Sequence, residues 1–159
     1  MKILVFTEGT VLKHVSDDRI KDYSSYVPVG GAVEKLTVWT ENGAEISYLT
    51  SRVKFMEIKQ IKDVLKNFDF PGDMVHARQE DETYKQVVMT VKPDLLIEDD
   101  CKSIGGEAEM ISFGLKSEAG IHVIVVPEFG GIDHLPDNLE ELKEFGKKEE
   151  VATTRDDTY

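Results

Sequence analysis

A few carboxylate, hydroxyl and amino side chains have the types and spacing that a binding or catalytic site needs. Glu8 follows one short apolar run, and Asp99 with Asp100 follows another. Because carboxylate oxygens are the ligands that hard cations prefer, we expect these three residues to form a Mg²⁺ site. Thr50 offers a hydroxyl donor and Lys85 an ammonium group, and together they could hold a phosphate.

The neighbours of these residues extend the candidate site. Thr7 and Gly9 flank Glu8, while Ser51 and Arg52 follow the candidate threonine. Glycine lets a backbone approach a ligand closely, and arginine can bind a phosphate through two parallel hydrogen bonds. We therefore predict Thr7, Gly9, Ser51 and Arg52 as ligand-binding residues. Glu8 is the candidate catalytic residue, because its carboxylate could act as a general base on a water. Arg52 could instead pair with an acidic neighbour.

Each of the other assignments also has a structural alternative. The Glu8 carboxylate could cap a helix or a loop. Asp99 and Asp100 could form a solvated turn, since acidic pairs are common in so acidic a chain. Thr50 fits an ordinary turn equally well, and Lys85 could be one of many solvated lysines.

Strands and helices must position these residues, and the apolar pattern alternates between the two. Continuous β-branched runs are typical of strands covered on both faces, and apolar residues at helical spacing fill the segments between them. The predicted strands are Ile3–Phe6, Ile46–Leu49, Met74–Ala77, Leu95–Ile97 and Ile121–Val126, and the predicted helices are Ala32–Trp39, Met56–Phe68, Glu82–Val91 and Leu135–Phe145.

This alternation predicts an α/β fold with a mostly parallel, five-stranded sheet flanked by helices. Ligands of open parallel sheets bind beyond the carboxyl ends of the strands. Most of the candidate residues directly follow the first, second and fourth predicted strands. We therefore expect them to lie close together at one edge of the sheet.

Composition limits the classes of function. The 159 residues suit one domain, and 19 Lys and Arg against 31 Asp and Glu give a net charge of −12. Such a charge repels nucleic acids, so an anionic ligand needs a cation or a local basic group in order to bind. The lone cysteine, Cys101, cannot form an intrachain disulfide. No apolar run has the length of a membrane span or a signal peptide, so we expect a cytoplasmic protein without membrane or nucleic-acid partners.

The domain organisation follows from where the apolar pattern stops. We expect one domain over residues 1–146, with a polar segment at 11–29 that forms a small lid over the site. Residues 147–159 are charged and have few apolar side chains, which predicts a flexible tail. The pattern leaves the oligomeric state open.

Four motifs in chain order resemble those of the haloacid-dehalogenase-like (HAD) superfamily, most of whose members are Mg²⁺-dependent phosphatases. Ile3–Thr10 resembles the family's strand followed by Asp-x-Asp-Gly-Thr, and Ile46–Arg52 resembles its strand that ends in Thr or Ser. Lys85 matches its lone lysine, and Leu95–Asp100 matches its acidic pair after a strand. The resemblance extends from about residue 1 to about residue 130. It implies a single HAD-like Rossmannoid domain, Mg²⁺ as cofactor and a small phosphorylated ligand.

The first motif differs from the family's at the position of the catalytic nucleophile. In this respect the chain resembles a prokaryotic branch of the superfamily with an altered first motif. Aligned on Gly9 and Thr10, Phe6 stands in place of the nucleophilic aspartate and Glu8 in place of the acid/base aspartate. Phenylalanine cannot attack phosphorus. The resemblance therefore implies a protein that binds Mg²⁺ and a phosphorylated ligand with weak or no standard phosphatase activity. The alternatives are an active phosphohydrolase, in which Glu8 acts with a metal-bound water, and a non-catalytic interaction module.

Overall fold

The structure is a computed structural model that describes residues 1–112, 115 and 120–147. The remainder of the predicted tail, residues 148–159, lies outside the described residues.

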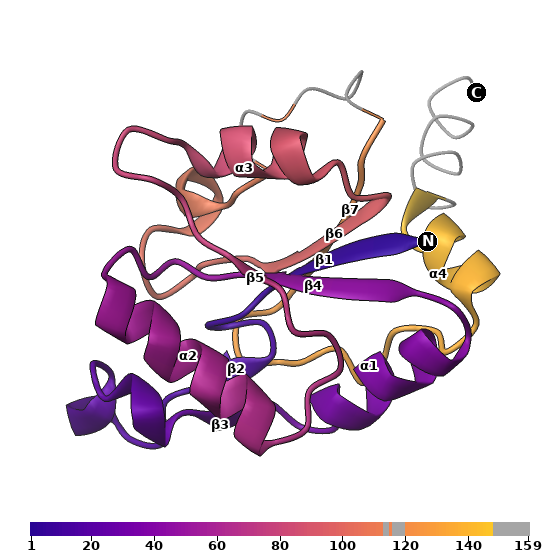
Figure 1. Cartoon of the computed structure of the whole chain (residues 1–159). Helices are drawn as coiled ribbons and strands as arrows, with labels where there is room; N and C mark the ends of the chain where they lie inside the picture. Colours follow the sequence, from indigo (N-terminus) through magenta and orange to yellow (C-terminus); the bar gives the residue numbers. More distant parts are fainter. Residues whose placement is uncertain (113–114, 116–119, 148–159) are drawn as a thin grey trace.

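A five-stranded parallel sheet forms the centre of the molecule (Figure 1). Its order is β5-β4-β1-β6-β7, and every neighbouring pair is parallel. The five predicted strands are all present, so the expected fold class is confirmed. The strands are β1 (Lys2–Phe6), β4 (Glu45–Leu49), β5 (Val75–His76), β6 (Leu95–Asp99) and β7 (His122–Val126).

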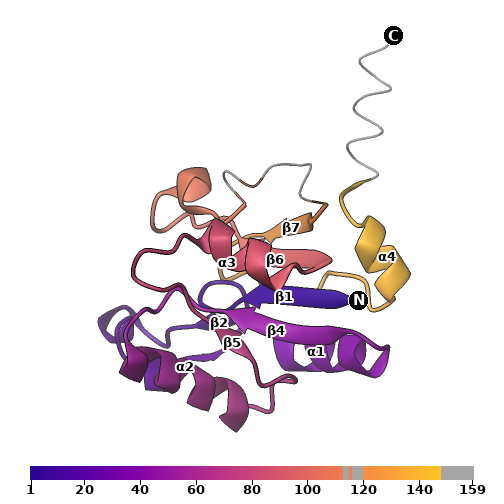
Figure 2. The ribbon, with the colours of Figure 1, turned by 45° about the horizontal axis from the view of Figure 1, so that its top comes forward.

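Helices cover both faces of this sheet. Helices α1 (Ala32–Glu41) and α2 (Phe55–Asn67) lie on one face, and α3 (Tyr84–Val91) lies on the other, as Figures 1 and 2 show from two directions. The helix predicted at Leu135–Phe145 is shorter, and α4 spans Leu139–Glu144. It begins late because the Asn138 side chain caps it, accepting a hydrogen bond from the Glu141 N–H at 3.0 Å.

The central strand is buried on both faces, as the continuous apolar run predicts. Ile3 and Val5 of β1 join the core cluster that contains Leu36 and Trp39 of α1. Leu4, between them, belongs to the second cluster, under α3. Alternate residues of one strand therefore tie both helical layers to the sheet, and this fixes the end of β1 where the candidate site begins.

The 11–29 segment contains a short antiparallel pair, β2 (Leu12–Lys13) with β3 (Val27–Pro28). Two short 3-10 turns, η1 (Asp17–Arg19) and η2 (Tyr23–Ser25), lie between these strands. Although most of the segment is polar, Tyr23 is buried and the η2 turn packs against α2. The segment is thus anchored beside the carboxyl ends of the strands.

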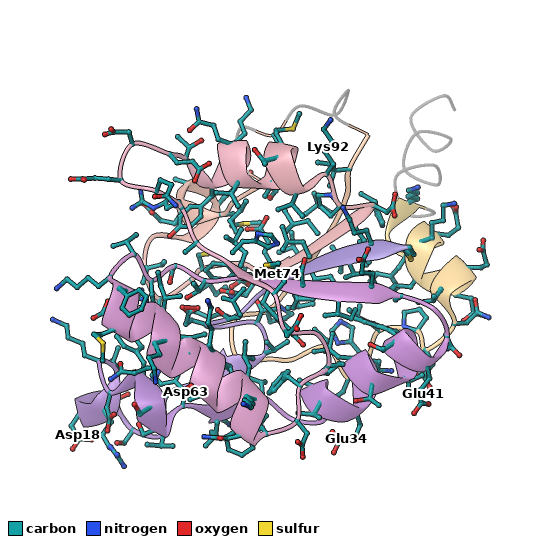
Figure 3. The ribbon with its side chains drawn as sticks, viewed as in Figure 1. Asp18, Glu34, Glu41, Asp63, Met74 and Lys92 are labelled. Carbon is teal, nitrogen blue, oxygen red and sulfur yellow. The ribbon has the colours of Figure 1, made fainter. Side chains whose placement is uncertain are left out.

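Acidic residues are exposed on the outside of the helical layer. Figure 3 shows Glu34 and Glu41 on α1 and Asp63 on α2, all on the solvent side of their helices. Among the described residues, no helix has the length and apolar character needed to cross a membrane.

The burial of β6, which carries Asp99 at its end, gives a test of the core. Ile97→Ala should lower the free energy of unfolding by about 2–5 kcal/mol, because Ile97 is fully buried and its truncation leaves a cavity. Val125→Ala on the adjacent β7 is the control, and it should cost about 0.5 kcal/mol or less because Val125 is 44% exposed. Urea unfolding followed by circular dichroism measures both, and equal losses would contradict this packing.

Candidate functional site

A cavity of about 530 Å³ opens at the carboxyl edge of the sheet. The loops after four strands, the 11–29 segment and the start of α3 all contribute to its lining. Its polar lining includes Glu8, His14, Tyr26, Ser51, Arg52, Tyr84, Asp99 and Glu128, and its apolar lining includes Phe6, Ile20, Ile104, Ile111 and Phe129.

Hydrogen-bond donors from two strand ends surround the Glu8 carboxylate. The Thr7 hydroxyl donates to Oε2, and the Thr50 hydroxyl donates to Oε1. The Ser51 N–H and hydroxyl lie 3.3 and 3.4 Å from the same Oε1. Both carboxylate oxygens are therefore held by donors, on a side chain that is only 12% exposed.

Arg52 adds a positive charge to this group. Its Nε lies 3.6 Å from Glu8 Oε1, so the two side chains form an ion pair. The guanidinium also stacks on the Tyr23 ring at 4.6 Å and donates through its Nη atoms to the Tyr23 hydroxyl and to Ser51 Oγ. The sequence left open whether Arg52 pairs with an acidic neighbour, and here that neighbour is Glu8.

A second polar group lies on the other side of β1 and consists of carboxylates. Asp99, Asp100 and Glu128 each offer an oxygen, and these oxygens lie within 4.8 Å of one another. Asp99 is fixed by the Thr10 hydroxyl at 2.9 Å and by the Cys101 N–H at 3.1 Å. Three converging carboxylates are a donor set that suits Mg²⁺. We refer to these three residues as the acidic triad.

The electrostatics of the acidic triad favour a cation. Burial raises the pKa of Asp99, and the nearby charge of Glu128 raises it further. Burial also raises the pKa of Cys101 to about 12, with Asp99 and Glu98 contributing. The Cys101 thiol therefore stays protonated at neutral pH, and the potential around it is negative.

Glu98 forms a separate arrangement, although it precedes Asp99 on the same strand. Its two oxygens accept the N–H groups of Ile111 at 2.6 Å and Ser112 at 2.7 Å. Burial raises its pKa despite these hydrogen bonds. Neighbouring residues of a strand point to opposite faces, which explains why Glu98 is separate from the acidic triad.

Most of the predicted site residues lie around this cavity, but not in the predicted grouping. Thr7, Thr50, Ser51 and Arg52 gather around Glu8, whereas Asp99 and Asp100 gather with Glu128. Glu8, which we expected to form a Mg²⁺ site with Asp99 and Asp100, is not one of the three residues of the acidic triad. Gly9 lies between the two groups, and a Cβ at this position would be 2.8 Å from Asp99 Oδ1.

Lys85 is exposed on α3 and does not line the cavity. Helix α3 turns Val87 and Val88 toward the sheet and Tyr84 toward the cavity, which leaves the next residue facing solvent. Tyr84 also packs edge-to-face on Phe6, with ring centroids 6.4 Å apart. The aromatic ring of Phe6 thus occupies the end of β1.

The prediction missed Glu128, which follows β7. The Ser103 N–H and hydroxyl both donate to its carboxylate at 2.7 Å, and its own N–H donates to Asp100 at 3.2 Å. The signal was present, because Glu128 comes two residues after the last predicted strand and the same carboxyl-end rule applies to it.

No family model matches this chain, and no curated protein matches it in sequence. Among solved structures, a chain of the Pnkp1/Rnl/Hen1 complex superposes on 80% of this chain with a TM-score of 0.61 at 11% identity. A chain of the Pnkp1/Rnl/Hen1 RNA repair complex covers the same share with a TM-score of 0.56 at 11% identity. This chain spans 46% and 42% of the lengths of those chains.

Another similar structure is a D,D-heptose 1,7-bisphosphate phosphatase from B. bronchiseptica, complexed with magnesium and phosphate. The superposition covers 82% of this chain and 94% of the phosphatase chain, with a TM-score of 0.49 at 13% identity. Identities this low bear on the fold alone. The sheet order and the flanking helices are consistent with the single HAD-like Rossmannoid domain that the motifs implied.

The close approach of Gly9 to Asp99 can be tested with a matched glycine. Gly9 and Gly43 both have positive φ, 93° and 102°, so alanine at either position should cost about 1–2 kcal/mol of stability. A Cβ at Gly43 meets nothing within 4 Å, whereas a Cβ at Gly9 displaces Asp99. Gly9→Ala should therefore be clearly the less stable variant in urea unfolding, and equal stabilities would refute the contact.

The raised pKa of Glu98 predicts a pH dependence. Because burial raises the folded-state pKa, the folded protein holds this proton more tightly than the unfolded chain does. The resulting stabilisation is complete below the unfolded-state pKa of about 4.3 and is lost as pH rises through the folded-state value. Wild type should therefore lose stability relative to Glu98→Gln as pH rises from about 4. Urea unfolding across pH in EDTA measures this, with exposed Glu80→Gln as control, and a constant difference would contradict it.

Proposed function

We propose that this protein binds a divalent cation, Mg²⁺, together with a small phosphorylated molecule, and that it does not act as a standard aspartyl phosphatase. The observation that carries the proposal is the division of one cavity into two polar groups. The acidic triad suits a cation, and the donors around Glu8 suit an anion. A metal phosphate complex needs both kinds of group at neighbouring positions.

The acidic triad would hold the cation. Asp99, Asp100 and Glu128 provide carboxylate oxygens close enough to share one ion, and hydrogen bonds already orient each of them. When bound, Mg²⁺ would neutralise part of their charge and polarise a phosphoryl oxygen. A chain with a net charge of −12 has particular need of such compensation before a phosphate can approach.

The phosphate end of the ligand would contact Thr50, Ser51 and Arg52. Two hydroxyls, a backbone N–H and a guanidinium are the donors that oxyanion sites commonly use. That these donors already surround a carboxylate supports their suitability for an anion. The apolar lining of the cavity, which includes Phe6 and Ile111, would accommodate the organic part of the ligand.

Three features favour binding over turnover. Phe6 offers no nucleophile at the end of β1. The Cys101 thiol, with a pKa of about 12, is not a thiolate at neutral pH. Both oxygens of Glu8 are engaged by hydroxyl donors, so this carboxylate is poorly placed to take a proton from water.

Mg²⁺ binding predicts a metal-dependent gain in stability. A cation present at ten times its Kd should add about 1.4 kcal/mol to the free energy of unfolding of wild type. Asp99→Asn should abolish this gain, because it removes a charged oxygen from the acidic triad. Asp63→Asn, the same change on the exposed face of α2, should retain the gain. Thermal unfolding with and without Mg²⁺ measures it, and an equal response of all three proteins would count against a specific site.

The absence of a nucleophile predicts low turnover. Wild type should hydrolyse a broad panel of phosphoesters no faster than a buffer blank with Mg²⁺, and Phe6→Asp should gain measurable turnover by restoring a carboxylate at the end of β1. Phosphate release measures both. Turnover by wild type that disappears in Glu8→Gln would contradict the proposal and would favour an active hydrolase that uses Glu8.

A further inference from the structure

The donors around Glu8 form an oxyanion site that the protein fills with its own side chain. The hydroxyls of Thr7 and Thr50 and both donors of Ser51 point at the Glu8 carboxylate rather than into the open cavity. Glu8 lines the cavity together with Ser51 and Arg52, so whatever enters meets these residues with the Glu8 carboxylate already in contact with them. An incoming phosphate therefore meets donors that are already in use.

The donor set is larger than a carboxylate can satisfy. Within the described part of the chain, Arg52 Nε is buried and makes no hydrogen bond, and its nearest acidic atom is Glu8 Oε1 at 3.6 Å. The other guanidinium nitrogens are occupied by Tyr23 and Ser51. A carboxylate offers two oxygens in one plane, whereas a phosphate offers up to four in a tetrahedron. A phosphate in this position could therefore accept a hydrogen bond from the Arg52 Nε–H, which makes none to Glu8.

Glu8 can leave this position without disrupting the sheet. It lies beyond the end of β1, which the structure places at Phe6, and Gly9 with a φ of 93° follows it. Its side chain reaches the donors through several rotatable bonds, so a change of rotamer suffices to move the carboxylate. The donors themselves are fixed by other contacts, such as the Thr50 N–H on His76 O at 3.0 Å and the stacking of Arg52 on Tyr23.

We propose that Glu8 is an internal competitor of the ligand, whose phosphate binds to Thr50, Ser51 and Arg52 only when the Glu8 carboxylate moves out. This inference rests on the proposed function, in which the cavity binds a phosphorylated molecule. It assigns to Glu8 the control of affinity instead of proton transfer. It also accounts for the position of a negative side chain among the donors that a phosphate would need.

Titration of inorganic phosphate, followed by calorimetry in the presence of Mg²⁺, tests this directly. Glu8→Ala should bind phosphate about tenfold or more tightly than wild type, since it releases several donors from a charged partner. Glu109→Gln removes the same charge from the cavity lining without touching these donors, and it should gain about threefold or less from reduced repulsion. Glu8→Gln should show an intermediate gain, and it provides the test if Glu8→Ala does not fold.

A second substitution locates the gain. Arg52→Gln in the Glu8→Ala background should abolish most of the increase, because the phosphate would lose its charged donor. If wild type binds phosphate and Glu8→Ala binds no more tightly than Glu109→Gln, the competition is refuted while the proposed function stands. If neither wild type nor any Glu8 variant binds phosphate, the proposed function fails, and this inference fails with it.

Discussion

The repulsion among carboxylates at the carboxyl edge of the sheet is the constraint on which the rest of the site depends. Glu8, Asp99, Asp100 and Glu128 come together in a chain whose net charge is −12. The described lining of the cavity includes one arginine and no lysine, so direct cationic compensation is small. The protein offsets the repulsion mainly with fixed hydrogen-bond donors from the same strand ends.

These donors are distributed in two sets, and this division gives the site its character. One set donates hydrogen bonds to both oxygens of Glu8, so the carboxylate is held much as a bound anion would be. The other orients the acidic triad, where burial first and the neighbouring carboxylates second raise the pKa of Asp99 and of Cys101. The donors around Glu8 therefore have no space for a second anion while Glu8 is in place. The acidic triad has an excess of negative charge that a cation would reduce.

The backbone around Gly9 couples the two groups. Asp99 approaches this residue so closely that a side chain would displace it, while the Gly9 carbonyl accepts the N–H of Phe129 at 2.8 Å. The loop after β1 is thus held between the ends of β6 and β7. Gly9 is therefore the point of the chain at which the Glu8 group and the acidic triad adjoin.

Much of this arrangement could be predicted from the sequence, because five short apolar segments, of which the first and last are continuous, located the strands and the carboxyl-end rule located Glu8, Thr50 and Asp99. Grouping was harder. The end of a strand fixes the position of a residue's backbone but not the direction in which a flexible side chain extends. The Glu8 side chain extends to the hydrogen-bond donors instead of the acidic triad. Lys85 shows a similar difficulty on a helix. The rotation of α3 about its axis brings Tyr84 to the cavity and leaves the next residue, Lys85, exposed.

Crystals grown with Mn²⁺ and tungstate, read by anomalous scattering, would test the central claim most directly. We expect Mn²⁺ on the carboxylates of Asp99, Asp100 and Glu128, and tungstate beside Thr50, Ser51 and Arg52 with the Glu8 side chain moved away. If both ions are absent from this cavity even at millimolar concentrations of each, the proposal that the cavity binds a metal and a phosphate together is wrong.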